Sequence, residues 1–318
     1  MSISYKHLLC IETEYGLIGP LSSKLIHDGP DNYVYVVVDA NNNKYALRVN
    51  KRAGKNISFE MAILTVFAQI GFSAPRLLRT KSKEYFSTID KVFVVLFIYI
   101  EGIQIKKISS EHLETGIIER GAKKLGELHR LTNGMMVEII PTRTIFTEFD
   151  RLLKINISIL ERFKDVRVVI EQVKFFYHDA LLRINSKKDL YGVIHNDYRV
   201  QNLIYTKDDC YIIDFDWSCY GPLSKDLGLA IAEWSMYTGN TGPSQEMIER
   251  FIKAYNETAP QVVLYNKDLI YWICFACLSD TCTFLADVVE GGYADKVIND
   301  VDQCYMYRKF KYFYGELK

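Results

Sequence analysis

Short apolar segments separated by polar turns fill the first hundred residues, a pattern typical of β-strands. Polar turns at 28–32 and 39–43 separate the first three segments. A fourth segment is apolar at nearly every position, and Glu101-Gly102 follows it. The predicted strands are Ser23–His27, Tyr33–Val38, Lys44–Asn50 and Lys91–Tyr99.

One segment of this region has a helical period instead. Its apolar residues recur every three or four positions, at Phe59, Ile63, Phe67 and Ile70. Ser58 is the expected N-cap, and Gly71 is expected to end the helix because glycine readily adopts the left-handed conformation of a C-terminal cap. The first hundred residues are therefore expected to form a small β-rich lobe with one helix.

Beyond Gly102, helical patterns replace the strands. The first predicted helix opens at Ser110. Its apolar positions are Leu113, Ile117, Leu125 and Leu128. Helical patterns continue at about 150–185 and from about 226 to the end of the chain, and a strand-rich insert at Tyr191–Asp216 separates them.

This order of elements predicts an α+β fold with two domains. We expect a small antiparallel-sheet lobe at residues 1–102 and a larger, mostly helical lobe at residues 103–318. The two lobes differ in character, because the first is built from short strands and the second from long amphipathic helices.

Composition excludes several classes of protein. Lys and Arg number 39, as do Asp and Glu, so the chain lacks the basic excess that binding to nucleic acid requires. Seven scattered cysteines favour free thiols in a reducing compartment. The apolar run Val92–Ile100 is too short to span a bilayer, and Met1–Tyr15 lacks the pattern of a signal peptide. We therefore expect a cytoplasmic protein with no nucleic-acid or membrane partner.

The strand-rich insert carries the candidate chemistry. It places His195, Asp197 and Asn202 in one loop between apolar strands, and a later strand ends on Asp214. Phosphoryl transfer needs a carboxylate that accepts the proton of the attacking hydroxyl and oxygen ligands for magnesium. The order and spacing of these residues match the kinase catalytic loop and its metal aspartate. Asp197 is the predicted base, Asn202 and Asp214 are the predicted magnesium ligands, and His195 is expected to support the loop.

This stretch resembles the aminoglycoside phosphotransferase and choline kinase family. The family loop reads His-Gly-Asp, with Asn five residues after the Asp, and Asn196 stands here at the Gly position. Ile213-Asp214-Phe215 is similar to the family's metal-site strand, and the segment 221–227 is similar to the one that follows it. The resemblance implies a protein-kinase-like two-lobe fold, and it implies that Asp226 braces the catalytic loop.

The match upstream concerns the nucleotide. Arg48 stands where kinases have a lysine that contacts the phosphates, and Ala46 lies on the same strand face, where it is expected to pack against adenine. Glu60 is the expected partner of Arg48. The segment Leu96–Gly102 resembles the family hinge, which implies that backbone groups around Ile98 and Ile100 bond the base.

Two departures from the pattern bear on the substrate. The loop Asp28–Asn32, which stands at the nucleotide loop, has one glycine and includes Pro30, which lacks an N–H group. A protein-kinase glycine-rich loop and an Ala-Pro-Glu motif are missing from the sequence. These absences favour a small-molecule kinase over a protein kinase.

The substrate side is less defined. Arg199 is predicted either to contact the γ-phosphate or the substrate, or to face solvent. Asp280 and Asp287 lie seven residues apart, hence on one helical face, and would suit a cationic substrate such as an aminoglycoside or an amino alcohol. The alternative for these two carboxylates is a solvated helix end.

The sequence therefore predicts an ATP- and magnesium-dependent phosphotransferase that acts on a hydroxyl group of a small molecule. It leaves open the choice between ATP and GTP, the acceptor and the oligomeric state. One alternative is a non-catalytic nucleotide-binding pseudokinase, which the intact set of Asp197, Asn202 and Asp214 disfavours. The other is a protein kinase, which the missing motifs disfavour.

Overall fold

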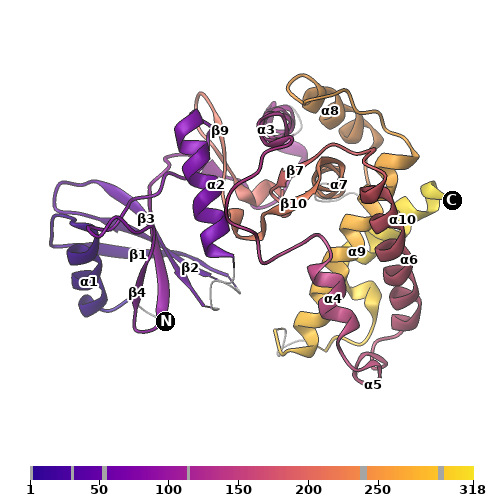
Figure 1. Ribbon diagram of the computed structural model, residues 1–318, viewed down its shortest axis with the longest axis horizontal. Coiled ribbons are helices and arrows are strands. Elements are labelled where there is room, and N and C mark those ends of the chain that lie inside the picture. Colours follow the sequence, from indigo (N-terminus) through magenta and orange to yellow (C-terminus); the bar gives the residue numbers. More distant parts are fainter. Residues whose placement is uncertain (1–2, 30–31, 52–55, 113–114, 237–241, 293–296) are drawn as a thin grey trace. The chain divides into compact units, whose positions relative to one another are not determined.

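The computed structural model describes the whole chain except residues 1–2, 30–31, 52–55, 113–114, 237–241 and 293–296 (Figure 1). It divides into two compact units. The first unit comprises Met1–Ile103 and Ile204–Asp216, and the second comprises Gln104–Leu203 and Trp217–Lys318. Each unit is described by itself below.

An antiparallel sheet of five strands, in the order β1-β2-β3-β5-β4, forms the frame of the first unit. Its strands are β1 (Ser22–Asp28), β2 (Asn32–Val38), β3 (Lys44–Asn50), β4 (Ser87–Ile89) and β5 (Val92–Ile98). All four predicted strands are present, and β4 is an additional short strand at the edge. In register, Arg48 of β3 lies between Val34 of β2 and Val95 of β5.

The described residues of the first unit form two helices, α1 (Tyr5–Tyr15) and α2 (Ile57–Ile70), where the sequence predicted one. The capping box of α1 uses Ser4 and His7, and the histidine takes the place of the usual Glu or Gln, so the start signal was missed. The N-cap of α2 is Asn56, not Ser58. The helix ends at Gly71 as predicted, with a left-handed backbone angle φ of 73°.

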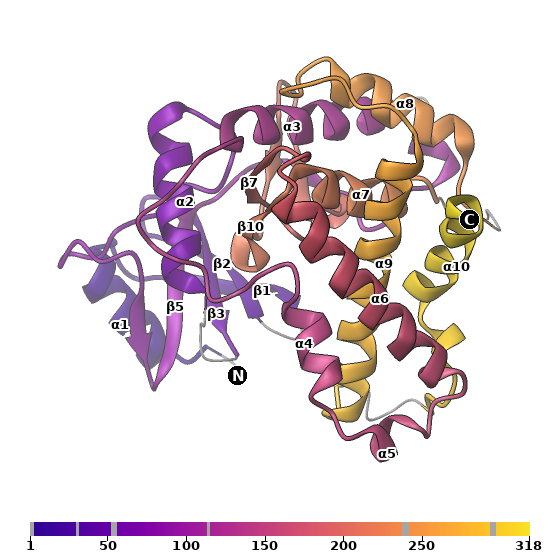
Figure 2. The ribbon, with the colours of Figure 1, turned by 45° about the vertical axis from the view of Figure 1, so that its right-hand side comes forward.

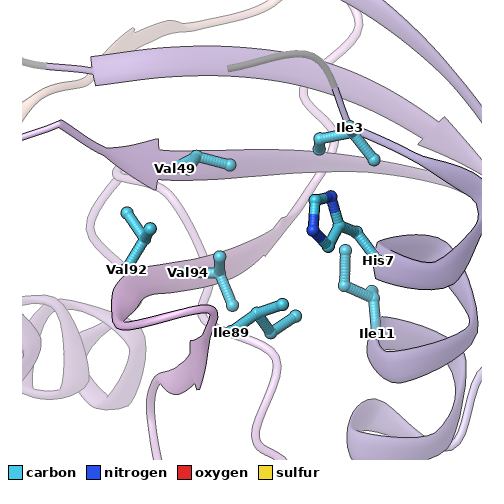
Figure 3. Close-up of a pocket in the computed structure, with 7 residues that line it drawn as sticks. All are labelled: Ile3, His7, Ile11, Val49, Ile89, Val92 and Val94. Atoms are coloured by element: carbon cyan, nitrogen blue, oxygen red, sulfur yellow. The ribbon is translucent and has the colours of Figure 1, made fainter.

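Apolar side chains attach α1 to the sheet. A small cavity lies between them, as Figure 3 shows. Its lining consists of Ile3, His7, Ile11, Val49, Ile89, Val92 and Val94. His7 is tied at both ring nitrogens, because Nδ1 accepts from the Ser4 N–H at 3.1 Å and Nε2 lies 2.8 Å from Asp90 Oδ2. The contact holds α1 against the turn before β5.

The return of residues 204–216 to the first unit differs from the predicted division after Gly102. This segment contains most of β8 (Leu203–Tyr205) and all of β9 (Cys210–Ile212), which form a three-stranded sheet with β6 (Ile103–Gln104) in the order β6-β8-β9. The Ile212 N–H donates to the Ser73 carbonyl at 3.1 Å. The Phe215 ring packs on Phe67 of α2 with 5.3 Å between ring centroids. These contacts assign the segment to the first unit.

Helices dominate the second unit. They are α3 (Ile117–Thr132), α4 (Thr147–Leu153), α5 (Ile157–Leu160), α6 (Val166–Asn185), α7 (Leu223–Trp234), α8 (Gln245–Asn256), α9 (Lys267–Val289) and α10 (Tyr305–Leu317). A two-stranded antiparallel sheet joins β7 (Tyr191–Ile194) to β10 (Cys219–Pro222). The helix predicted to open at Ser110 begins later, because Gly116 adopts a left-handed conformation (φ 69°) just before α3. Leu113 lies outside the described residues.

The longest helix, α9, is central to this unit and packs against α4, α7 and α10 (Figure 2). It is long and apolar enough to cross a membrane by length and composition, and 83% of its apolar window is buried inside the structure. Its apolar surface is therefore used for packing, around Trp272 and Phe275.

Candidate active site

The loop that carries the predicted base follows β7 in the second unit. Its backbone turns at Asn196, which has a left-handed φ of 67°. Asparagine tolerates this conformation better than most residues, so it replaces the glycine expected at this position. The buried Asn196 side chain donates through Nδ2 to the Trp217 carbonyl at 3.0 Å, and its Oδ1 accepts from Lys225.

A buried carboxylate supports this loop from α7. Asp226 accepts the backbone N–H groups of His195 and Asn196, each at 2.8 Å. His129 Nε2 lies 3.2 Å from the same carboxylate, and its Nδ1 lies 2.8 Å from the Tyr255 hydroxyl. Burial raises the pKa of Asp226, but the bond and charge of His129, with the charges of His195 and Lys225, outweigh burial and lower it. His129 was not among the predicted site residues.

Asp197 and Asn202 contact each other directly. Asp197 Oδ2 accepts from Asn202 Nδ2 at 2.9 Å, and the same amide nitrogen donates to the Asp197 carbonyl at 2.8 Å. These bonds occupy the amide nitrogen and leave Oδ1 of Asn202 as the atom able to ligate a cation. The Asp197 carboxylate is held by Asn202, and the side chain is 25% exposed, so it remains open to a ligand.

Arg199 does not face solvent, in contrast to one of its two sequence interpretations. Its side chain is 15% exposed, and its guanidinium contacts Asp197, Asp280 and Tyr305. Burial raises the pKa of Asp280, and the charge of Arg199 only partly offsets this.

The two aspartates predicted to suit a cationic substrate, Asp280 and Asp287, are both paired with arginines of the second unit. Asp280 contacts Arg199, and Asp287 accepts from Arg151 Nη2 at 2.6 Å. Their side chains are 17% and 19% exposed, so neither belongs to a solvated helix end. Contact of these carboxylates with a cationic substrate remains a prediction, and such a substrate would have to compete with resident arginines.

The predicted phosphate-binding cation lies in the first unit. Arg48 forms a buried bidentate pair with Glu60, through bonds of 2.7 and 2.5 Å. Arg48 Nη1 also lies 3.8 Å from Asp214 Oδ1. Burial lowers the pKa of Arg48, but the charges of Glu60, Asp216 and Asp214 raise it overall, so the side chain stays charged.

The predicted metal aspartate, Asp214, has a left-handed backbone conformation, with φ of 68°. Such conformations are rare outside glycine and cluster at functional sites. Two residues on, the Asp216 carbonyl accepts from Asn56 Nδ2 at 3.1 Å and its carboxylate from Asn32 Nδ2 at 3.4 Å. Asp216 and Asn56 were not predicted, because their roles depend on contacts across about 160 residues of sequence.

The donor chemistry of the predicted magnesium ligands fits a hard cation, since Asp214 supplies a carboxylate and Asn202 an amide oxygen. Within the described residues no group of three or more His, Cys, Asp or Glu side chains is arranged to bind a metal ion. Asn202 and Asp214 belong to different units, and their joint binding of magnesium remains a prediction.

The predicted adenine contacts differ in their availability. The Ile98 N–H donates to the Arg76 carbonyl at 2.9 Å, so it is not free for a base. The neighbouring Tyr99 N–H donates to the Lys44 carbonyl at 3.3 Å. Ile100 lies beyond the end of β5 and remains the predicted hinge contact, while Ala46 is half-buried on β3.

The glycine-poor turn between β1 and β2 has its own cation. Lys51 Nζ donates to Asp28 Oδ1 and to the Gly29 carbonyl, each at 2.5 Å. It also lies 3.9 Å from the centroid of the Tyr33 ring. Residues 30–31, which include Pro30 and Asp31, lie outside the described residues.

Comparison with known proteins identifies the chain. A model of the phosphotransferase enzyme family (APH) matches residues 22–264. The chain belongs to the phosphotransferase enzyme family. This phosphotransferase is a small-molecule kinase, as predicted. No functionally curated protein sequence matches it significantly.

Solved structures share the fold of this phosphotransferase. One is the amicoumacin kinase hAmiN in complex with AMP-PNP, Ca²⁺ and Ami, at 16% identity and a TM-score of 0.72, over 98% of this chain and 91% of that one. A microcompartment-associated aminopropanol kinase is 17% identical, with a TM-score of 0.64 over 89% of this chain and 93% of that one. A choline/ethanolamine kinase family protein from Mesorhizobium loti is 18% identical, with a TM-score of 0.62 over 95% and 90% of the two chains. The predicted kinase-like α+β fold is confirmed.

Proposed function

We propose that this phosphotransferase transfers the γ-phosphate of ATP directly to a hydroxyl group of a small molecule. The observation that carries the proposal is the state of Asp197, whose carboxylate is fixed by Asn202 and Arg199 yet 25% exposed. A general base needs both properties, because it must be held in position and must also reach the hydroxyl proton.

The chain's residues divide the work as follows. Asp197 accepts the proton of the attacking hydroxyl. Arg48, oriented by its bidentate pair with Glu60, contacts the nucleotide phosphates. Asn202 and Asp214 would each supply an oxygen ligand to magnesium, which neutralises charge on the phosphates when it is bound.

The choice of ATP rests on the amicoumacin kinase, whose structure contains AMP-PNP, an analogue of ATP. The acceptor class rests on the relatives as well. Amicoumacin kinase, aminopropanol kinase and the choline/ethanolamine kinase family protein are named for small molecules, none of them a protein. A hydroxyl-bearing small molecule of antibiotic or amino-alcohol type is therefore the first class to test.

A turnover screen tests the proposal. ADP release from Mg-ATP is measured with choline, ethanolamine, aminopropanol, homoserine, thiamine, hexosamines, aminoglycosides and macrolides, and with casein as a protein acceptor. We expect at least one small molecule to stimulate ADP release and to gain a phosphate by mass spectrometry. Nucleotide binding without turnover of any acceptor would favour the pseudokinase instead, and phosphorylated casein would favour a protein kinase.

A further inference from the structure

Arg199 lies two residues after the predicted base, and its guanidinium contacts four acceptor groups of the protein. Nε donates to Asp197 Oδ1 at 2.5 Å, and Nη1 donates to the Tyr305 hydroxyl at 2.5 Å. Nη2 donates to Asp280, and Nη1 lies 3.5 Å from Glu233 Oε2. All three guanidinium nitrogens are thus engaged by groups of the protein.

Apart from Asp197, the acceptors of Arg199 come from three helices of the second unit. Glu233 lies at the end of α7, Asp280 in the middle of α9 and Tyr305 at the start of α10. Lys309, one turn after Tyr305, donates to Glu233 at 3.0 Å and so fixes this carboxylate as well. Both α7 and α10 pack against α9, so the helices that carry these groups are packed together.

The charges around Arg199 indicate a role in positioning. Asp197, Asp280 and Glu233 are carboxylates that face its guanidinium, and Lys309 contacts Glu233. A phosphate-binding arginine needs donors directed at its ligand. Arg199 instead has an acceptor on every nitrogen, and three of its four acceptors are carboxylates, which disfavours the approach of a phosphate.

We propose that Arg199 is a positioning residue, which fixes the Asp197 carboxylate in the orientation that receives the hydroxyl proton and is itself held by Asp280, Glu233 and Tyr305. This inference rests on the proposed function and adds a link between the catalytic loop and the helices α7, α9 and α10. It replaces the predicted contact of Arg199 with the γ-phosphate or the substrate.

Kinetics of two arginine variants test this role. Arg199→Gln removes the positive charge and the guanidinium donors. Arg183→Gln serves as a matched control. Arg183 likewise bonds two carboxylates of the second unit, Asp179 at 2.8 Å and Asp268 at 3.0 Å, but it does not contact the loop. We expect Arg199→Gln to lower kcat by about 10-fold to 10²-fold, because a misplaced Asp197 carboxylate slows the chemical step. The KM for ATP should stay within about twofold. The control should keep both constants.

Chemical rescue separates positioning from general support of the fold. Arg199→Ala with added guanidinium chloride should regain part of the lost kcat, whereas methylammonium at the same concentration should not, because only guanidinium can bridge Asp197 and Asp280. Asp280→Asn keeps the shape of the acceptor and provides a second variant if Arg199→Ala does not fold. We expect it to lower kcat with KM for ATP unchanged. A rise in KM for ATP at unchanged kcat in Arg199→Gln would overturn the proposal and make Arg199 a phosphate contact.

A measurement that needs no acceptor distinguishes this inference from the proposed function. The Arg199 Nε–H signal, observed by ¹⁵N-edited NMR, should shift in Asp197→Asn, and the Arg183 Nε–H signal should not. An unmoved Arg199 signal would overturn the positioning role whatever the turnover screen finds. A shifted signal, with no turnover of any acceptor by the wild type, would refute the proposed function and leave the contact established.

Discussion

Arg48, which is buried, and Arg199, which is 15% exposed, are stabilised in different ways. Arg48 has one bidentate partner, Glu60, which fixes the plane of its guanidinium. Arg199 distributes its donors over Asp197, Asp280 and Tyr305, which fixes the carboxylates around it. A buried charge is stabilised by an opposite charge and by hydrogen bonds, so each arrangement depends on its partners. The first suits a residue that presents its cation to a ligand, and the second suits a residue that orients a neighbour.

Asp214 provides a prediction at this scale. Asp214→Ala removes a carboxylate that is 41% exposed and lies 3.8 Å from Arg48. Magnesium ligands act in the ground state and the transition state alike, so both nucleotide binding and turnover should weaken. Calorimetry with ATP, in the presence and absence of magnesium, measures the effect. Unchanged magnesium dependence in the variant would show that Asp214 is not the metal aspartate.

Asp226 provides a second prediction, which concerns pH. The pKa of Asp226 is lower in the folded protein than its ordinary value, so its contribution to stability is complete above the unfolded pKa of about 3.9 and is lost as the pH falls through the folded value. Asp226→Asn should destabilise the protein at pH 7 by about 1.5–3 kcal/mol for each charged hydrogen bond lost. The variant should also show a shallower loss of stability below about pH 3.9.

Urea unfolding of both proteins over a pH series measures this difference. The expected result is a gap in unfolding free energy that is constant near neutral pH and narrows in the acid range. A gap that does not change with pH would show that Asp226 acts by packing alone.

Among the helices of the second unit, α7 and α9 approach each other closely at Gly228. A Cβ added at Gly228 of α7 would lie 2.7 Å from the backbone of Trp272 in α9. This distance is shorter than van der Waals contact, and backbone cannot move aside as a side chain can. The same two helices carry Glu233 and Asp280, so their spacing also sets the support of Arg199.

Gly228→Ala tests this contact, with Gly315→Ala as its control. Gly315 lies in α10 with nothing within 4 Å of an added Cβ. We expect Gly228→Ala to destabilise the protein by about 1–3 kcal/mol through overpacking. Gly315→Ala should stabilise it by up to about 1 kcal/mol, because alanine is the better helix former. Thermal unfolding distinguishes the two, and equal effects of the two substitutions would show that α7 and α9 do not approach so closely.

Across the whole molecule, the sequence predicted those features that depend on residues close together in the chain. The strands of the first sheet alternate with clear turn signals. Asp197 and Asn202 lie within one loop, so their spacing alone placed them together, and they contact each other in the structure. The support of Arg199 was not predictable, because Glu233 and Tyr305 carry no local motif and meet Arg199 only through the packing of α7, α9 and α10. The capping box of α1 escaped notice for a different reason, since His7 is an unusual residue in that role.

If this chain is an ATP-dependent small-molecule kinase with Asp197 as its base, loss of that carboxylate must slow phosphate transfer itself. Single-turnover transfer from labelled ATP to the acceptor found in the screen measures this step, with the wild type and Asp197→Asn compared at saturating nucleotide. We expect a phosphorylated product from the wild type, and a rate lower by about 10²-fold to 10⁴-fold in the variant, with ATP binding nearly unchanged. A variant rate within tenfold of wild type would remove Asp197 from the mechanism.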